Sequence, residues 1–298
     1  KLKSRVTADT GWSEPNLIVT GGVSGGILLS VLSLINPGDE VIVPDPYFVI
    51  YKHLVNMMGG RCVYVDSYPD FQLPCEQIAG AITDRTKMIV VNSPANPTGK
   101  VYSRQSLERL AGIAAEHDVI VLSDEIYRDF CYDTECPSIS RYYNKTILLN
   151  GFSKAYSMSG WRLGYLAADE ALAEVVEQML KIQQYTFVCA PSPFQRAAAA
   201  ALDFDISHLV DSYRTKRDMI YEGLSDCFEI VRPEGAFYAF VKAPHGAATS
   251  FVERAVKKNL LIIPGNVFSE KDTHFRISYA ACEEDICRGI EILRGLRD

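Results

Sequence analysis

The fold is decided by stretches of the kind found at residues 146–154, which read TILLNGFSK. Thr146–Leu149 is a continuous rather than an alternating run, and such a run is typical of a strand that is covered on both faces. Gly151 then permits a turn, and Lys154 follows three residues later. The sequence therefore predicts a buried strand that delivers a lysine just past its carboxyl end.

The same kind of run recurs through the first two-thirds of the chain. Six further runs are Leu17–Thr20, Glu40–Val43, Cys62–Val65, Met88–Asn92, Val119–Leu122 and Leu163–Ala167. Amphipathic segments lie between several of them, and Gln105–Glu116 is an example that follows a candidate helix cap at Ser103. Strands that alternate with helices predict an α/β fold, with a mostly parallel seven-stranded sheet and helices on both faces.

Past Ala190 the pattern loses this βαβ regularity. The expected helices are Gln195–Ala201, Ile206–Leu224, Ser250–Lys258 and Glu283–Leu296. The expected strands are Phe228–Val231, Ala236–Val241, Leu260–Ile263 and Phe275–Tyr279. We interpret this part as a smaller α+β domain at residues 213–298, which follows a large domain at residues 1–212.

Composition narrows the class of protein. The 298 residues are 48% hydrophobic and carry a net charge of −7, which favours an ordinary soluble globular protein and gives no support for nucleic acid or an anionic membrane as a partner. Leu17–Ile35 has no charged residue, but its two Gly-Gly pairs predict a strand, a turn and a helix rather than a membrane span. The eight cysteines form no C-x-x-C pair, so we expect free thiols in a reducing cytosol and neither a zinc site nor a disulfide framework.

Polar and turn-forming residues follow most of the predicted strands. Their segments are Gly21–Gly26, Pro44–Phe48, Ser93–Gly99, Ser123–Tyr127 and Gly151–Lys154. In open α/β sheets, ligands bind beyond the carboxyl ends of the strands. The glycine loop opens a helix and can hold a phosphate with its N–H groups, although it matches neither the dinucleotide nor the Walker pattern and can equally be a tight turn.

Four charged residues have both an ordinary and a chemical interpretation. Asp124 is either a helix cap or a buried anion that keeps a ring nitrogen protonated. Lys154 is either a solvated lysine or a desolvated amine that attacks carbonyl carbon, with Arg162 as a nearby cation and phosphate ligand. Arg276, in an apolar strand, either points to solvent or clamps a carboxylate.

Four motifs occur in order and together resemble one family. They are Asn96–Gly99 (NPTG), Asp124–Tyr127 (DEIY), Ser153–Lys154 with Gly160–Gly164 (GWRLG), and Phe275–Tyr279 (FRISY). They are similar to those of the class I/II aminotransferases of pyridoxal-phosphate (PLP) fold type I, and the resemblance runs from about Val19 to the C-terminus. It implies an enzyme of amino-acid metabolism that moves the amino group of an L-amino acid to a 2-oxo acid.

The resemblance also implies a role for each matching residue. Lys154 would hold PLP as a Schiff base and shuttle a proton, Asp124 would bind the pyridine nitrogen, and Arg276 would grip the substrate carboxylate. The remaining cofactor ligands would be Tyr127 and Asn96 at the phenolic oxygen, Phe48 stacked on the ring, and Val23, Ser24, Ser153 and Arg162 at the phosphate. Lys154, Asp124 and Tyr127 would then be the catalytic residues, Asn96 would also contact substrate, and no metal is expected.

The sequence departs from the family at its start. Members usually have a longer N-terminal segment that completes the small domain and covers the substrate, and we expect that segment to be absent here, where the sequence starts at Lys1. That segment carries much of the specificity, so the amino acid used is left open; Gln184, Tyr185 and Tyr238 are further pocket candidates. The resemblance implies a cytoplasmic homodimer.

Two other functions remain open from the sequence. A carbon–sulfur β-lyase or an aminocyclopropane-carboxylate synthase would use the same residues, because the cofactor sets the chemistry and the pocket selects the bond. An aminotransferase-like sensor domain of a transcription regulator would need a basic helix-turn-helix upstream. A purely structural protein would leave Lys154, Asp124, Arg162 and Arg276 without a purpose.

Overall fold

The computed structural model describes residues 1–297; Asp298, the last residue of the predicted small domain, lies outside them. Helices occupy Leu2–Thr10 (α1), Gly22–Leu34 (α2), Ile50–Met57 (α3), Cys75–Ala81 (α4), Arg104–Glu116 (α5), Ala173–Thr186 (α6), Ser192–Ala201 (α7), Ser207–Leu224 (α8), Ala248–Val256 (α9) and Glu283–Gly295 (α10). Short 3-10 helices lie at Ile139–Arg141 (η1), Ser159–Trp161 (η2), Glu170–Leu172 (η3) and Gly265–Val267 (η4). Strands occupy Asn16–Thr20 (β1), Glu40–Asp45 (β2), Arg61–Asp66 (β3), Thr86–Asn92 (β4), Ile120–Asp124 (β5), Thr146–Gly151 (β6), Gly164–Ala168 (β7), Tyr238–Lys242 (β8), Ile263–Pro264 (β9) and His274–Ser278 (β10).

Seven strands form one sheet in the order β1-β7-β6-β5-β4-β2-β3, so the predicted mostly parallel seven-stranded sheet is confirmed. Strands β3, β2, β4, β5 and β6 pair in parallel, whereas β7 is antiparallel to both β6 and β1. Because β7 is reversed, its first residues lie at the edge where the parallel strands end. Residues just before β7 therefore meet the loops that follow β4, β5 and β6.

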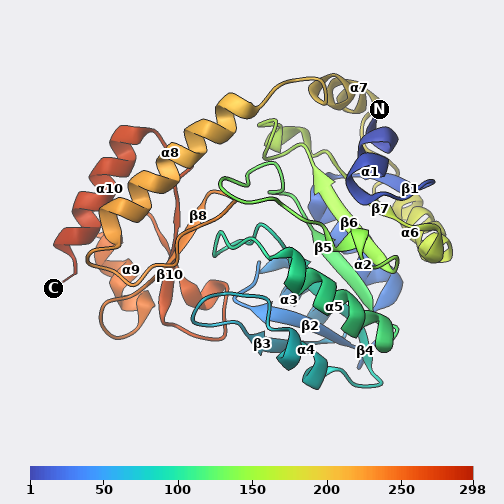
Figure 1. Cartoon of the computed structure of the whole chain (residues 1–298), viewed down its shortest axis with the longest axis horizontal. Helices are drawn as coiled ribbons and strands as arrows, with labels where there is room; N and C mark the ends of the chain where they lie inside the picture. Colours follow the sequence, from blue (N-terminus) through green and yellow to red (C-terminus); the bar gives the residue numbers. More distant parts are fainter. Residues whose placement is uncertain (298) are drawn as a thin grey trace.

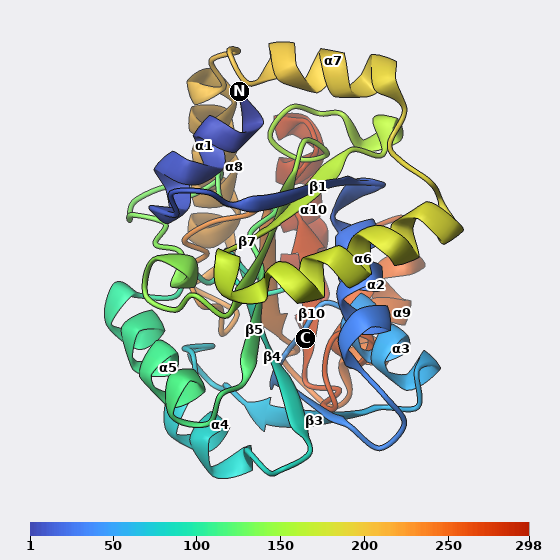
Figure 2. The same cartoon turned by 90° about the vertical axis from the view of Figure 1, so that its right-hand side faces the viewer.

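Helices cover both faces of this sheet, as predicted. In Figure 2 the sheet is seen nearly edge-on, with α2, α3 and α6 on one side and α1, α4 and α5 on the other. Successive side chains of β2 point to opposite faces of the sheet. Val41 and Val43 pack in the core under α2, α3 and α6, whereas Ile42 packs in the core under α4 and α5. Helix α5 begins directly after Ser103, whose hydroxyl accepts from the Ser106 N–H at 3.1 Å, so the predicted cap is confirmed.

The uncharged stretch Leu17–Ile35 forms β1 and α2 in the interior. Helix α2 packs closely on the sheet because Gly26 has no side chain: a Cβ there would lie 2.7 Å from a methyl carbon of Leu149. Within residues 1–297, no helix combines the length and the apolar character that crossing a membrane requires.

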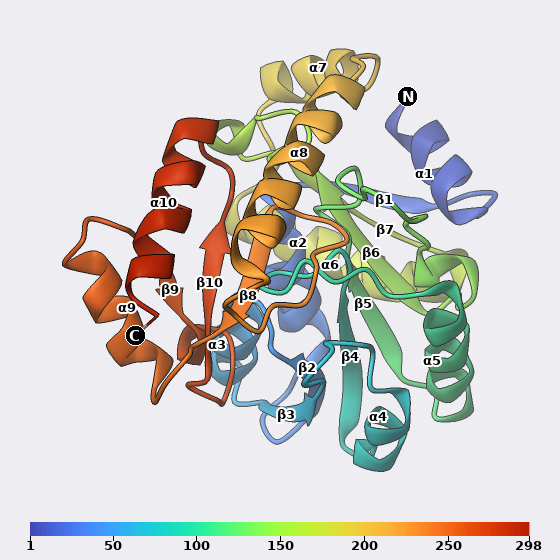
Figure 3. The same cartoon turned by 60° about the vertical axis from the view of Figure 1, so that its left-hand side comes forward.

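The last third of the chain, orange to red in Figure 1, lies beside the large sheet. Its strands form a three-stranded antiparallel sheet in the order β8-β10-β9, and Figure 3 shows α8 and α10 side by side against it. The helices and the strands β8 and β10 lie where the sequence predicted them, within about two or three residues. The predicted boundary at residue 213 falls inside α8, and the division into two domains stays a prediction.

Two predicted strands are wrong. Phe228–Val231 forms only a bridge between Ile230 and Val241, because the chain then turns away and the N–H groups of Glu234 and Gly235 bond the Gly99 carbonyl instead.

Of Leu260–Ile263, only Ile263 lies in a strand, the two-residue β9. The Leu260 N–H bonds the Ala255 carbonyl at the end of α9, and Pro264 has no N–H with which to extend the pairing. In both cases, backbone bonds to another partner outweighed a β-branched composition.

Candidate active site

A cavity of about 280 Å³ lies at the carboxyl edge of the large sheet and includes two residues of the small sheet. Its lining residues are Val23, Ser24, Ile27, Phe48, Asn92, Asn96, Asp124, Ile126, Tyr127, Ser153, Lys154, Ser159, Arg162, Tyr238 and Arg276. All ten residues that the sequence singled out for the site are among them. The structure thus brings together side chains that are up to about 250 residues apart in the chain.

One corner of the cavity is suited to an anion. Val23 and Ser24 lie in the first turn of α2, where backbone N–H groups have no intrahelical partner. Arg162 reaches this turn because Gly22 has no side chain: a Cβ there would lie 2.6 Å from an Arg162 guanidinium nitrogen. The guanidinium is held by the Ser159 carbonyl at 3.0 Å.

A second glycine, Gly164, allows two elements to approach closely at the same corner of the cavity. Gly164, the first residue of β7, lies so close to α2 that a Cβ there would be 2.6 Å from the Val23 nitrogen. The helix N-terminus therefore lies directly on the start of β7. Together with Ser153, the corner offers N–H, hydroxyl and guanidinium donors, the set that binds phosphate, while the Ser159 hydroxyl donates to the Ser153 carbonyl at 2.9 Å.

Asp124 is the last residue of β5, and only 2% of it is exposed. Its carboxylate accepts from the Tyr51 hydroxyl at 2.7 Å and from the Ile126 N–H at 3.2 Å. Burial raises the pKa of Asp124 to about 6, although both hydrogen bonds and the Lys154 charge act to lower the pKa. This buried carboxylate would therefore be stabilised by a cationic ligand in the cavity.

Lys154 is half-buried in the loop after β6. Its amine lies 5.6 Å from the ring centres of both Tyr127 and Phe237. Burial lowers the pKa of Lys154, and the charges of Arg276 and Arg162 lower it further. A less basic amine is more often unprotonated at neutral pH, and only the unprotonated amine is a nucleophile or a base.

Arg276 projects from β10 with its guanidinium carbon 4.5 Å from the Tyr238 ring centre and 4.4 Å from that of Phe268. One guanidinium nitrogen donates to the Asn96 side-chain oxygen at 2.9 Å. Among the residues that the structure describes, the buried Nε of Arg276 has no hydrogen-bond partner. A guanidinium that is held between two aromatic rings and has an unpaired N–H donor is suited to bind a carboxylate.

Asn96 is fixed from two sides. Its N–H donates to the Asn92 side-chain oxygen at 2.9 Å, and its own side-chain oxygen accepts from Arg276. The side-chain NH₂ group of Asn96 is then the part that faces a ligand as a donor. Asn92 also donates to the Asp124 carbonyl at 3.0 Å and so ties the ends of β4 and β5 together.

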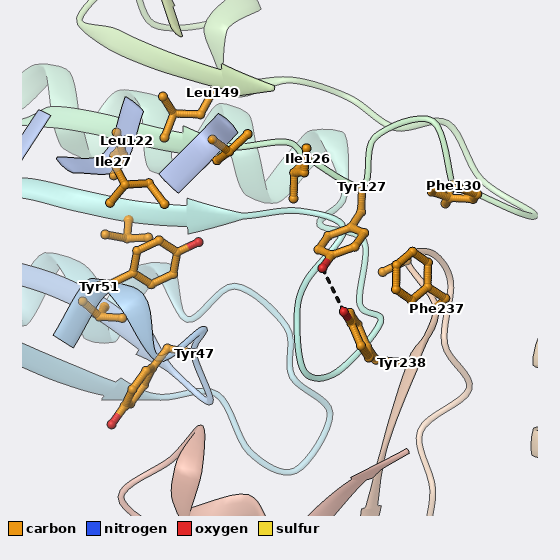
Figure 4. Packing of buried hydrophobic residues seen from close by; sticks show 14 of the residues in the cluster. Ile27, Tyr47, Tyr51, Leu122, Ile126, Tyr127, Phe130, Leu149, Phe237 and Tyr238 are labelled. Carbon is orange, nitrogen blue, oxygen red and sulfur yellow. Dashed lines mark hydrogen bonds between the residues drawn. The ribbon is translucent and has the colours of Figure 1, made fainter. Parts of the chain in front are cut away.

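The hydroxyl groups of Tyr127 and Tyr238 point toward one another and lie 3.0 Å apart (Figure 4). Tyr127 comes from the loop after β5 and Tyr238 from the start of β8, so this bond joins the large and small sheets. Of the three further pocket candidates, Tyr238 lines the cavity. Gln184 and Tyr185 do not line it, and Tyr185 is 85% exposed near the end of α6.

Sequence reasoning missed five residues that the site uses: Tyr51, Asn92, Ser159, Phe237 and Phe268. Asn92 ends a predicted strand and could have been found from its position there. Tyr51, Phe237 and Phe268 look like core aromatics, and no sequence signal separates them from the other buried rings. Within residues 1–297, no group of three or more His, Cys, Asp or Glu side chains is placed to hold a metal ion.

Comparison with known proteins gives a consistent result. Residues 10–290 match the family described as aminotransferase class I and II. The chain is 38% identical over 302 residues to a probable aspartate aminotransferase of Methanocaldococcus jannaschii, a match that covers 99% of this chain and 80% of the relative. It is 34% identical over 289 residues to aromatic-amino-acid aminotransferase 2 of Thermococcus litoralis, a match that covers 92% of this chain and 74% of the relative.

Solved structures agree with these relatives. Aspartate aminotransferase from Thermus thermophilus with maleate superimposes with a TM-score of 0.94 at 34% identity, covering 99% of this chain and 80% of that one. An aromatic aminotransferase from Pyrococcus horikoshii superimposes with a TM-score of 0.93 at 31% identity, and the match covers 99% of this chain and 85% of that one.

Proposed function

The chain belongs to the class I and II aminotransferase family, and from this premise we propose that its cavity binds PLP and transfers the amino group of an L-amino acid to a 2-oxo acid. Family membership makes the protein an aminotransferase. The place of the cofactor and the role of each residue are the proposal.

The observation that carries the proposal is a pair of complementary groups in one cavity. Asp124 is a buried carboxylate with a raised pKa, and Lys154 is an amine with a lowered pKa. The donor-rich corner at α2 supplies the third requirement, an anion site. Carboxylate, amine and anion corner match the ring nitrogen, the aldehyde and the phosphate of PLP, so the residues present fit the cofactor.

When bound, PLP supplies an aldehyde that the Lys154 amine holds covalently and a ring that withdraws electrons from the substrate α-carbon. Asp124 keeps the ring nitrogen protonated, since an opposite charge in contact shifts a pKa by about 1–3 units. The corner formed by Val23, Ser24, Ser153 and Arg162 would hold the phosphate, and Phe48 would stack on the ring.

The remaining residues orient the substrate and move its proton. Arg276 and the side-chain NH₂ group of Asn96 hold the α-carboxylate, which fixes the direction of the α-carbon–hydrogen bond. Once the substrate amino group has replaced it at the aldehyde carbon, the freed Lys154 amine would remove the α-proton as a general base, a contribution of about 10²–10⁴ in rate. Tyr127 donates to the ring oxygen.

Aspartate and the aromatic amino acids are the proposed first donors, because three relatives at 34–38% identity that cover most of the chain carry those names. These names also favour transamination over the lyase reactions. The homodimer and the cytoplasmic location implied by the resemblance stay predictions.

The test is a half-reaction. Protein loaded with PLP is mixed with single amino acids in the absence of a 2-oxo acid, and the visible absorbance of the cofactor is followed. We expect at least one donor to convert the cofactor to its amine form with release of one equivalent of 2-oxo acid. Release of pyruvate with ammonia, or with ammonia and sulfide, would instead indicate a lyase, and no conversion with any donor would contradict the proposed function.

A further inference from the structure

We propose that Tyr238 is a positioning residue that serves two parts of the site at once: its ring holds the Arg276 guanidinium, and its hydroxyl orients the hydrogen of Tyr127. This inference rests on the proposed function. It extends that function by joining the substrate-carboxylate site to the cofactor's ring-oxygen site through one side chain.

The first half of the inference rests on strand geometry. Arg276 pairs with Phe240 and Ser278 pairs with Tyr238 across the antiparallel strands β10 and β8. Tyr238 is therefore the diagonal neighbour of Arg276 on the same face, a distance that an aromatic ring and a long side chain can bridge. The measured 4.5 Å from the guanidinium carbon to the Tyr238 ring centre is close enough for a cation–π contact.

Phe268 lies at 4.4 Å from the same guanidinium carbon, so both rings contact the one cation. Apart from these rings, the guanidinium has one side-chain hydrogen bond, to Asn96, within the described residues. Arg276 is thus held chiefly by aromatic contact, which leaves its remaining N–H groups for a ligand. Phe268 has no hydroxyl, which makes it a natural control for the ring alone.

The role of the Tyr238 hydroxyl follows from the number of hydrogens that the two tyrosine hydroxyls can donate. Tyr127 and Tyr238 share one hydrogen bond of 3.0 Å, and either hydroxyl can be its donor. Each hydroxyl has a single hydrogen. If Tyr127 is to donate to an oxygen in the cavity, it must accept from Tyr238. Tyr238 is 7% exposed and has no other hydrogen-bond partner within residues 1–297, so its hydrogen is free for this purpose.

The direction of this bond has a measurable consequence. A hydroxyl that accepts one hydrogen bond becomes a better donor in the next. A stronger donor at the cofactor's ring oxygen stabilises negative charge there and keeps the pH midpoint of the cofactor's visible absorbance low. Removing the Tyr238 hydroxyl should therefore raise that midpoint without touching the cofactor.

Three variants separate the two halves. Tyr238→Phe keeps the ring and removes the hydroxyl, Tyr238→Leu removes both, and Phe268→Leu removes a ring that carries no hydroxyl. Two quantities are measured for each variant: the pH midpoint of the cofactor absorbance, and the dissociation constant of an unreactive carboxylate, maleate or 3-phenylpropanoate, whichever the wild type binds. If Tyr238→Leu fails to fold, Tyr238→Met replaces it.

Tyr238→Phe is expected to raise the pH midpoint by about 0.3–1 unit and to change carboxylate affinity less than about twofold. Phe268→Leu should weaken carboxylate binding by about 3- to 30-fold and leave the midpoint in place. Tyr238→Leu should show both effects. In steady state, Tyr238→Leu and Phe268→Leu should raise KM more than they lower kcat.

Two results would overturn the inference: a Tyr238→Phe midpoint equal to that of the wild type, or a Tyr238→Leu protein that binds the carboxylate as tightly as the wild type. The carboxylate measurement is made with and without PLP, so it does not depend on the cofactor. A wild-type protein without a visible cofactor band contradicts the proposed function together with the role of the hydroxyl, and the carboxylate measurement then still decides the role of the ring.

Discussion

Lys154→Ala is expected to lower turnover by at least about 10⁴-fold and to remove the visible absorbance of the PLP-loaded protein. The first effect follows because the substitution removes both the covalent holder of the cofactor and the general base, and the base alone contributes about 10²–10⁴. The second follows because the variant has no amine at that position. Activity is measured with the best donor from the half-reaction panel, and the absorbance is recorded on the same sample.

The fold should survive this change. Lys154 is half-buried and within residues 1–297 makes no salt bridge, and its burial is itself unfavourable to its charge. Lys181→Ala is the matched control, because Lys181 on α6 is an exposed lysine paired only with Glu177. Equal melting temperatures in the two variants, with activity lost in Lys154→Ala alone, are the expected pattern. A Lys154→Ala protein that keeps both turnover and the absorbance band would refute the assignment.

Asp124→Asn is expected to lower turnover by about 10²-fold or more. The amide has nearly the same shape and can still accept from the Tyr51 hydroxyl, but it carries no charge to keep a ring nitrogen protonated. Losing an effect of about 1–3 pKa units on that nitrogen weakens the electron sink on which every step depends. Asp118→Asn, at an exposed residue paired with Lys145, is the control for the change of side chain itself and should keep wild-type activity.

The same variant gives a stability test that needs no cofactor. Asp124 has a pKa of about 6 in the folded protein and an ordinary value of 3.8. Between these pH values the folded state holds the proton more tightly than the unfolded state, so the free energy of unfolding falls as pH rises from about 4 to about 6, by about 3 kcal/mol. The Asp124→Asn variant has no carboxyl at this position, so its free energy of unfolding should not show this fall.

Denaturant unfolding of cofactor-free protein between pH 4 and pH 7 measures the effect. The difference in unfolding free energy between Asp124→Asn and wild type should grow in favour of the variant across this range and then level off. Other buried acids titrate equally in both proteins and cancel from the difference. A difference that is constant with pH would show that the carboxylate is not strained by its burial.

The gathering of strand-end residues around one cavity could be predicted because two simple rules act together. A continuous apolar run marks a buried strand, and parallel strands deliver their carboxyl ends to one edge. Asp124 directly ends such a strand and Lys154 follows one closely, so both could be placed in one cavity from the sequence. Arg162 joins them only because β7 is antiparallel, which brings its start to the same edge.

Contacts that depend on how a helix or turn lies could not be predicted. Tyr51 is 73 residues from Asp124 and reaches it only through the placement of α3, which packs on α2 and β3. Phe268 reaches Arg276 from a 3-10 turn whose position is set by backbone bonds, such as that between the Tyr47 N–H and the Phe268 carbonyl. Gln184 and Tyr185 were misplaced for the same reason, since no local pattern shows which way the end of α6 faces.

The strand errors have a related cause. Residues 228–231 and 260–263 have strand-forming side chains, but their neighbours are engaged elsewhere, at Gly99 and at the end of α9. Side-chain preference predicts a strand where a partner edge is free, and it says nothing of competing backbone partners. Of the four strands predicted past Ala190, the two without such competition, β8 and β10, are the ones that formed.

The most direct measurement of the central claim, that the Lys154 amine is the one that holds the cofactor beside Asp124, is chemical mapping. PLP-loaded protein is reduced with borohydride, digested, and analysed for the peptide that carries the added mass. We expect one labelled site, at Lys154. A label on another lysine would contradict it, above all on Lys100, which is buried but whose amine already binds Glu234 at 2.8 Å; a protein that takes no label at all would contradict it equally.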